Sequence, residues 1–299
     1  MTILILGATG NLGRLAATTL ARAHPEVGLR LSSHRDEGRA QLRGSFPAAE
    51  VVDADWYDES SLFRAIAGVD RILVVTPDFT TDETVVTPNL IRAIKAAGRV
   101  KQVVRLIAIP PAFTINDLSE AQLATRCGAA QHVVAKPLLD SSGLPVTYVN
   151  AACWIMFNLS WFMSEDVKST RRLLMPSCAD AARLWVSETD LADIFAKLLT
   201  DSAELHVGRE YLVTAGRRYT FAQVASLLGE VVGEPVTYVD SDSSLRRAMG
   251  ESFSTLMTYL SHETQAYAGV PVTRVIEQLV GRAPMTLREY AEFHKDAFL

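Results

Sequence analysis

Short apolar runs alternate with amphipathic stretches through the first half of the chain. The apolar runs predict six strands, over residues 2–6, 28–33, 50–55, 70–77, 101–109 and 145–150. The segments between them predict helices from about residue 11, over 36–43, 59–68 and 83–98, and in a long stretch through Leu139. Continuous apolar strands separated by helices are typical of a parallel sheet covered on both faces. With right-handed crossovers, we expect a doubly wound α/β domain.

The ends of these helices carry recognisable signals. Gly68, Gly98 and Gly143 each follow a helical run and precede a strand, where a left-handed residue that ends the helix is expected. Asp58 is expected to cap the helix that follows it. We interpret all four residues as structural.

The pattern changes after residue 150. Residues 187–201 predict a helix with a polar start, where Ser187, Thr189 or Asp190 could provide the cap. A strand, a helix and a strand are expected over residues 209–240, and helical segments up to Phe298. No long linker separates the halves. We therefore expect a first domain over residues 1–151 and a smaller region over 152–299, mostly helical with short strands, that forms one wall of a cleft.

Composition excludes several classes of partner. The 299 residues carry a formal charge of -5, so no basic excess exists to bind nucleic acid or an anionic membrane. The three cysteines are widely spaced and the six histidines are scattered, which disfavours a disulfide scaffold or a metal site. We see no signal peptide and expect no membrane-spanning segment. A cytoplasmic protein with a small-molecule substrate is expected.

Three glycines follow the first strand directly. Gly7, Gly10 and Gly13 form a G-x-x-G-x-x-G turn that opens a helix. The first permits a tight turn, the second lets a pyrophosphate approach the backbone, and the third lets helix and strand pack closely. The helix N-terminus adds free N–H groups and a favourable dipole. The turn predicts dinucleotide binding in a Rossmann-type NAD(P)-binding domain, with contacts from Gly7, Thr9, Gly10, Asn11, Leu12 and Gly13.

The stretch "GATGNLGR" resembles the short-chain dehydrogenase/reductase superfamily, and specifically its atypical NmrA-like branch. "VVDADWYDESSLFRAIAGVDRILVVTP", "NLIRAIKAAGRVKQVVRL", "AAQHVVAKPLLDSSGLPVTYVNAACWIMFNL" and "SETDLADIFAKLL" resemble later parts of that branch in the same order. The nearest group is the NAD(P)H-dependent quinone reductase-like members, and the resemblance implies NADP. It also implies a cofactor site that includes Asp55 beside the adenine, Thr76 and Pro77 by the nicotinamide ribose, and Ala108 and Asn150 at later strand ends.

The end of the second strand bears on the choice between NADP and NAD. An NAD-specific fold places a carboxylate there for the ribose hydroxyl. This chain has Ser33, His34 and Arg35 instead, which together could bind a 2′-phosphate. Arg35 could also be a solvated turn residue. We favour NADP, with NAD as the less favoured cofactor.

The sequence identifies the catalytic residues less clearly than the cofactor site. None of the eight tyrosines has a lysine four positions later, so the Tyr-x-x-x-Lys acid–base pair of many short-chain enzymes is absent. The resemblance matches His132 to a histidine common in NmrA-like reductases, but Lys136 and Pro137 stand where the family has Glu and Lys. His132 could orient a substrate oxygen and Lys136 could reach a ribose or a carbonyl. Packing and surface roles remain open for both.

Hydride transfer does not require an acid from the protein. A quinone or a similar conjugated carbonyl can take hydride from a stacked nicotinamide and a proton from water, provided that the protein supplies a dry, flat pocket. Phe113, Trp154 and Phe157 are the candidates to line this pocket, although aromatic residues at such spacing also build cores.

Two functions follow from these patterns. The first is an NAD(P)H-dependent reductase of quinones or similar small conjugated carbonyls. The alternative is a non-catalytic NADP-binding redox sensor of the NmrA type, which would act on a protein partner or as a homo-oligomer. Sensing would require different affinities for oxidised and reduced cofactor.

Overall fold

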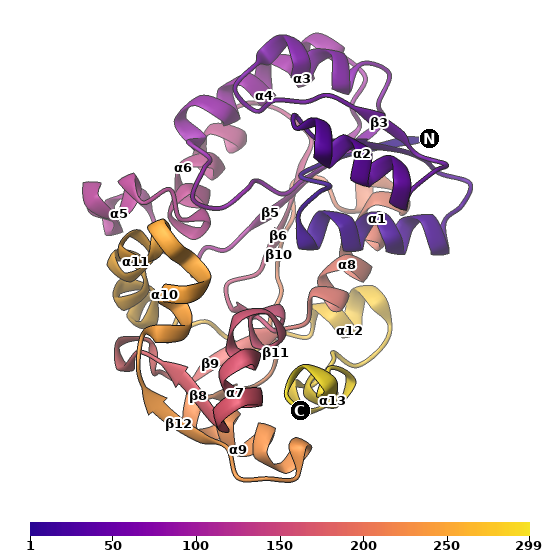
Figure 1. Ribbon diagram of the computed structural model, residues 1–299. Helices are drawn as coiled ribbons and strands as arrows, with labels where there is room; N and C mark the ends of the chain where they lie inside the picture. Colours follow the sequence, from indigo (N-terminus) through magenta and orange to yellow (C-terminus); the bar gives the residue numbers. More distant parts are fainter. The chain divides into compact units, whose positions relative to one another are not determined.

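The computed structural model describes residues 1–299, and they form two compact units with interleaved chain segments (Figure 1). Unit 1 contains Met1–Ile109, Gly128–Asn150 and Leu191–Leu212. Unit 2 contains Pro110–Cys127, Ala151–Asp190 and Val213–Leu299. The expected linear division after residue 151 therefore assigns Leu191–Leu212, which belongs to unit 1, to the second region.

Unit 1 is built on a seven-stranded sheet in which every neighbouring pair of strands is parallel. The strand order is β10-β6-β5-β4-β1-β2-β3. The doubly wound parallel sheet expected from the apolar runs is confirmed. The strands are β1 (Thr2–Leu6), β2 (Gly28–Ser32), β3 (Glu50–Val52), β4 (Arg71–Val74), β5 (Gln102–Ile107), β6 (Val146–Asn150) and β10 (Glu210–Leu212).

Helices cover both faces of this sheet. On one face α3 (Glu59–Ile66), α4 (Glu83–Ala97) and α6 (Gly128–Asp140) pack side by side, and α1 (Asn11–Ala23) and α2 (Asp36–Ser45) lie on the other (Figure 1). Helix α8 (Glu188–Thr200) begins in unit 2 and continues in unit 1. The Oγ of Ser187 accepts a hydrogen bond from Thr189 N, so Ser187 is the residue that caps its start.

The prediction of one long helix between the fifth strand and Leu139 is wrong. A 3-10 turn, η1 (Ile115–Asp117), and a short helix, α5 (Glu120–Ala124), precede α6, and both belong to unit 2. Arg126 interrupts the run because its φ of 52° lies in the left-handed region, which a continuous α-helix excludes. Pro137 lies inside α6, one turn before the helix ends.

The predicted helix ends are confirmed. Gly68, Gly98 and Gly143 have φ values of 77°, 69° and 73°, and Gly98 is the C-cap of α4. The Asp58 side chain accepts a hydrogen bond from Ser60 N at the start of α3. At these positions the local signals in the sequence are structural, as predicted.

Unit 2 combines two small sheets with short helices. Its strands are β7 (Trp154–Ile155), β8 (Arg172–Met175), β9 (Arg183–Val186), β11 (Ala215–Tyr219) and β12 (Thr237–Asp240). Its helices besides α5 are α7 (Ser164–Thr170), α9 (Phe221–Val232), α10 (Ser243–Met249), α11 (Phe253–Ala266), α12 (Val275–Val280) and α13 (Leu287–Phe293). The expected succession of helical segments towards Phe298 is confirmed.

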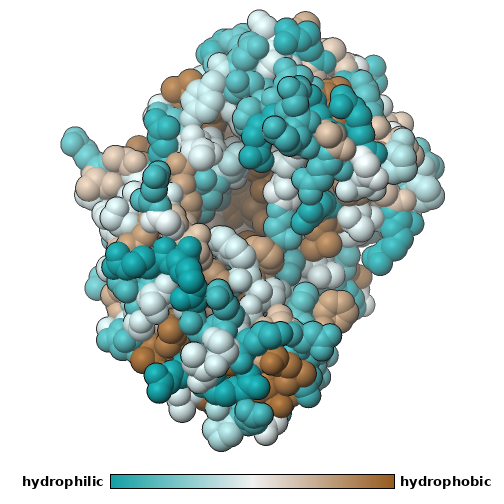
Figure 2. All heavy atoms as spheres, viewed as in Figure 1, coloured by the Kyte–Doolittle hydropathy of each residue, from teal (hydrophilic) through white to brown (hydrophobic).

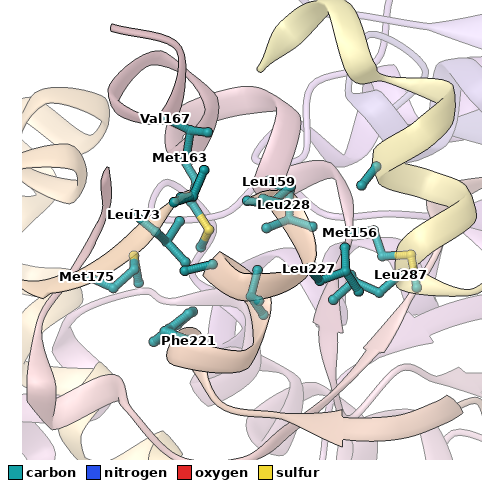
Figure 3. Packing of buried hydrophobic residues seen from close by; sticks show 14 of the residues in the cluster. Met156, Leu159, Met163, Val167, Leu173, Met175, Phe221, Leu227, Leu228 and Leu287 are labelled. Atoms are coloured by element: carbon teal, nitrogen blue, oxygen red, sulfur yellow. The ribbon is translucent and has the colours of Figure 1, made fainter. Parts of the chain in front are cut away.

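A hydrophobic core holds unit 2 together. Side chains from a π-helical turn, η2 (Leu159–Met163), and from α7, β8, α9 and α13 point toward one another (Figure 3). Leu159, Met163, Leu173 and Leu228 have no exposed surface at all. No helix anywhere in the chain combines the length and the apolarity that a bilayer crossing needs.

Candidate functional site

The glycine turn has the geometry that its spacing predicts. Gly7 has a φ of 93°, and a Cβ at this position would lie 2.1 Å from the carbonyl oxygen of Val75. A Cβ at Gly13 would lie 2.2 Å from the carbonyl oxygen of Gly7. Both distances are far below contact distance, so only glycine allows the turn, β4 and α1 to approach so closely.

The N-terminus of α1 is open to a ligand. Gly10 occupies the cap position without a side chain to bond the first N–H groups, and the first turn contains no acidic residue. A Cβ at Gly10 would touch only Gly7 O, at 3.4 Å. Backbone donors and the positive end of the helix dipole are therefore available to an anion, as phosphate binding requires.

The turn between β2 and α2 lies close to the glycine turn that precedes α1. A Cβ at Gly38 would lie 2.4 Å from Ser33 Oγ and 3.1 Å from Thr9 Cγ2, so α2 packs closely on both residues. Hydrophilic side chains cover the surface of α2 (Figure 2). Ser33 is buried, whereas His34 and Arg35 are exposed.

Two arginines at the start of α2 have different roles. The guanidinium of Arg39 donates to the carbonyl oxygens of Ser33 and His34 and to Asp53 Oδ1 at 2.9–3.0 Å. It thereby fixes the path of the backbone. The Arg35 guanidinium has no partner in the protein and is the cation that remains available to a phosphate.

The other expected cofactor residues lie at the carboxyl edge of the sheet. Asp55 uses one carboxylate oxygen to accept a hydrogen bond from Tyr57 N at 2.9 Å. The hydroxyl oxygen of Thr76 accepts a hydrogen bond from the Arg105 guanidinium at 3.1 Å, and the carbonyl of Pro77 accepts one from Thr81. Because an accepting hydroxyl keeps its proton, Thr76 can still donate to a ligand.

His132 has a fixed orientation. Its Nδ1 accepts a hydrogen bond from the backbone N–H of Ala108 at 2.9 Å, which brings two expected site residues together. Burial lowers the pKa of His132 well below its usual range, and the charge of Arg105 lowers it further. The imidazole is therefore neutral, with its proton on Nε2.

Lys136 lies in an ion-pair network. Its Nζ contacts Asp140 Oδ2 at 2.9 Å and Glu210 Oε2 at 3.6 Å, and it lies 4.8 Å from the centre of the Tyr148 ring. Burial opposes its charge, but the carboxylates outweigh burial and raise the pKa of Lys136. Its ammonium is held among protein groups and stays protonated.

Asn150 holds two strand ends together. Its Oδ1 accepts from Ile109 N at 2.9 Å, and its Nδ2 donates to Ile109 O at 2.8 Å and to Glu210 Oε1 at 2.7 Å. Its amide group is thus fully used between β5, β6 and β10. Its position at the carboxyl edge agrees with the prediction, and its bonds indicate that it orders this edge.

The expected substrate-binding aromatic residues lie in unit 2. Trp154 packs in the core, with its ring centre 5.4 Å from that of Trp185 and 5.5 Å from that of Phe221. Phe157 is partly exposed and stacks on Trp161, which is 50% exposed. Phe113 lies 5.4 Å from the ring of His262. Phe113 and Phe157 therefore retain exposed surface for a ligand, and Trp154 keeps very little.

Three functional candidates escaped the sequence interpretation. Arg39 fixes the β2–α2 turn, and Arg105 and Glu83 form an ion pair behind Thr76 and His132. A charged residue inside the apolar run "VVRLIAI" was the available signal for Arg105, because a buried arginine requires a partner. Nothing local in the sequence marks Glu83 as that partner.

The chain is similar to known proteins over nearly its whole length. Residues 1–295 match the model of the NmrA-like family. A (4-alkanoyl-5-oxo-2,5-dihydrofuran-3-yl)methyl phosphate reductase of Streptomyces griseus is 29% identical over 305 residues, covering 99% of each chain. An NAD(P)H azoreductase of Xenophilus azovorans is 28% identical over 99% of each chain.

The fold is also found in solved structures. The NADPH complex of a quinone oxidoreductase from Escherichia coli superimposes with a TM-score of 0.76 at 22% identity, over 98% of this chain and 99% of that one. NmrA, a negative transcriptional regulator solved with NADP, gives a TM-score of 0.74 at 17% identity, over 97% and 94%.

Proposed function

Because the chain belongs to the NmrA-like family, we propose that it is an NADPH-dependent oxidoreductase that reduces a small conjugated carbonyl compound, such as a quinone. The observation that carries this proposal is the glycine turn at the uncapped N-terminus of α1, followed at the next strand end by the unpartnered Arg35. Named relatives over the full length of the chain are reductases.

The residues present fit this cofactor. The backbone of Gly10, Asn11 and Leu12 would hold the pyrophosphate, since no side chain competes for the N–H groups there. Arg35, with Ser33 and His34, would bind the 2′-phosphate that distinguishes NADP from NAD. Bound NADPH would supply a hydride from its nicotinamide ring.

The acceptor chemistry follows from what the chain lacks. No Tyr-x-x-x-Lys pair exists, Lys136 is held by carboxylates, and His132 is neutral. A conjugated carbonyl suits such a site because it can accept hydride without prior protonation and then take a proton from water. The protein's contribution is to hold and orient the reactants and to exclude water from them.

The test is to titrate NADPH into the protein and follow nicotinamide fluorescence, then add quinones, unsaturated lactones and azo dyes. Binding followed by protein-dependent oxidation of NADPH is expected, with at least one class turned over. Failure to bind NADPH, or binding of NADH in preference, would contradict the cofactor assignment.

A second function is favoured by the ion pairs of Lys136, which leave the site without a mobile acid. An NADP-dependent sensor would bind cofactor without turning over any acceptor class. It would also have to bind NADP⁺ and NADPH with different affinities, since equal affinities cannot shift a conformational equilibrium. Titration with both forms separates this function from the reductase.

A further inference from the structure

Strand β5 carries a fully buried charge at its centre. The side chain of Arg105 is 2% exposed and that of its partner Glu83 is 1% exposed. One Arg105 nitrogen donates to Glu83 and to Thr76, and Thr87 donates to the other oxygen of Glu83. The Arg105 Nε is buried and has no partner. Removing two charges from water is expensive, and apolar replacements of such pairs often leave stability unchanged or increase it. Folding alone does not account for this pair.

The groups that this pair controls lie at the carboxyl edge of the sheet. Arg105 fixes the hydroxyl of Thr76, at the end of β4, and its charge acts on His132, whose Nδ1 is bound by Ala108 at the end of β5. Protonation of His132 would place a second proton on Nδ1, directly against the Ala108 N–H. The ring therefore keeps one donor, Nε2–H, and no contact within the protein uses it.

The charged groups around His132 are few. Arg105 on β5 is paired with Glu83 on α4, but of the two only the arginine charge acts on His132, and Lys136, one turn further along α6, is paired with Asp140 and Glu210. No carboxylate binds the imidazole directly. The surroundings of His132 thus contain nothing that would stabilise an imidazolium.

We propose that Arg105, paired with Glu83, is a positioning residue that keeps His132 as a neutral Nε2–H donor for the oxygen on which negative charge develops during reduction. This inference rests on the proposed function for the identity of that oxygen. The acceptor carbon gains a hydrogen and an electron pair from the dihydronicotinamide, which is oxidised. The carbonyl π electrons move onto oxygen, where Nε2–H stabilises them, and water then supplies the proton. His132 keeps its own proton throughout.

The first test does not depend on turnover. Nitrogen-15 NMR of the labelled histidines distinguishes Nε2–H, Nδ1–H and imidazolium forms, and the signal of His132 is the one lost in His132→Gln. We expect the Nε2–H form from pH 8 to below pH 6. An Nδ1–H form, or an imidazolium at pH 7, would overturn the inference even if NADPH is oxidised normally.

The second test changes the ion pair. The double variant Arg105→Met/Glu83→Gln removes both charges without leaving either one unpaired, and we expect the pKa of His132 to rise, because the repulsion from Arg105 is lost while burial remains. Its kcat is expected to decline as the pH falls through that pKa, while the wild-type kcat shows no such step. The single variant Arg105→Lys retains the positive charge. Its kcat is therefore expected to have the same pH profile as the wild type.

A matched control separates positioning from packing. Arg71, the first residue of β4, is also a buried arginine, and it is held by the carbonyl oxygens of Leu198 and Asp201 at the opposite end of the strands. Arg71→Lys is expected to reduce stability without moving the His132 resonances. An unchanged His132 pKa in the double variant, or an equal shift in the Arg71 variant, would overturn the role of Arg105. Absence of NADPH binding by the wild type would instead overturn the proposed function and leave the NMR result to decide the role of Arg105.

Discussion

Individual glycines determine the geometry of the glycine turn. Gly7 combines a positive φ with a lack of space, whereas Gly13 has ordinary backbone angles and lacks space alone. Gly44, in α2, has neither restriction, because a Cβ there would meet nothing within 4 Å. Alanine substitutions at Gly13 and Gly44 can therefore be compared, because an added Cβ would clash at Gly13 and would meet nothing at Gly44.

Gly13→Ala is expected to destabilise the protein by several kcal/mol, roughly as overpacking does, because its Cβ would meet rigid backbone. NADPH binding should be lost with it. Gly44→Ala should be neutral or stabilising by about 0.5–1 kcal/mol, because alanine favours the helix. Urea unfolding and fluorescence titration measure both effects. Equal stability of the two variants would show that the turn tolerates a side chain.

Arg35 is expected to select the phosphorylated cofactor. Arg35→Ala should weaken NADPH binding by about 1.5–3 kcal/mol, the usual contribution of a hydrogen bond to a charged group, and leave NADH binding nearly unchanged. Arg43→Ala removes another exposed arginine from α2 and is the control. Equal losses for both cofactors, or equal losses in both variants, would show that Arg35 does not bind the 2′-phosphate.

His132 is expected to give stability a particular pH dependence. Its folded-state pKa is depressed, first by burial and then by Arg105, while the unfolded chain binds a proton near pH 6.5. As the pH falls below about 6.5, His132 binds a proton in the unfolded state but not in the folded state. The free energy of unfolding therefore falls by up to about 1.4 kcal/mol per pH unit. His132→Gln should flatten the curve between pH 6.5 and 5. Parallel curves for the two proteins would show that His132 is protonated in the fold.

Prediction from sequence succeeded for residues whose role is local. The glycine turn, the N-cap of Asp58 and the left-handed Gly98 depend on neighbours within a few positions, and each is found as expected. Glu83 and Arg105 are 22 positions apart and meet only because the fold brings the start of α4 against the middle of β5. The spacing of apolar and polar residues along the chain does not show that these two side chains meet.

At the scale of elements, helix α9 brings the core of unit 2 together. Phe221, Val224 and Leu228 on its buried face pack into the cluster that β8 and α13 also line (Figure 3). Thr220 and Gln223 form a reciprocal capping box at its start, and Gly233 ends it with a φ of 87°. Both ends follow from sequence signals, which is why this helix could be predicted closely.

The capping box of α9 is expected to stabilise unit 2 measurably. Thr220→Ala should lower the free energy of unfolding by about 1 kcal/mol, because the backbone N–H of Gln223 loses its acceptor. Thr220→Ser keeps the hydroxyl and is the control. Chemical denaturation provides the comparison, and a serine variant as unstable as the alanine variant would point to the lost methyl group instead.

The helix that was wrongly predicted shows where element signals fail. The sequence predicts one long helical stretch through Leu139, yet the left-handed Arg126 separates α5 from α6, which belong to different units. Sequence periodicity reports which face of a segment is apolar. It does not report which unit a segment belongs to, and here α5, which buries no residue, belongs to unit 2, whereas α6 belongs to unit 1.

At the scale of the whole molecule, the two units exchange segments along the chain. Strand β10 pairs in register with β6 from Glu210 opposite Tyr148 to Leu212 opposite Asn150. Residues 1–151 alone would lack β10 and α8 and would leave β6 as an exposed, apolar edge. A division of the chain at residue 151 therefore does not yield a complete sheet.

Residues 1–151 expressed alone are expected to aggregate or to unfold without cooperativity, because an unpaired flat edge strand recruits other chains. The full chain should unfold cooperatively under the same conditions. Near-ultraviolet circular dichroism during thermal unfolding, together with light scattering, makes the comparison. A soluble fragment that melts cooperatively at the full-length Tm would show that β10 adds little to the sheet.

The late position of β10 has a consequence for synthesis on the ribosome. Glu210, which bonds Asn150 across the last pair of strands, is 60 residues further along the chain. At about 5–20 residues per second, β6 waits roughly 3–12 s for its neighbour to be made. During that interval the nascent sheet has an open edge, and the first part of the second core, from Trp154 to Trp185, is made before the first core is closed. We therefore expect the newly made chain to bind chaperones that cover strand edges until translation has passed Leu212.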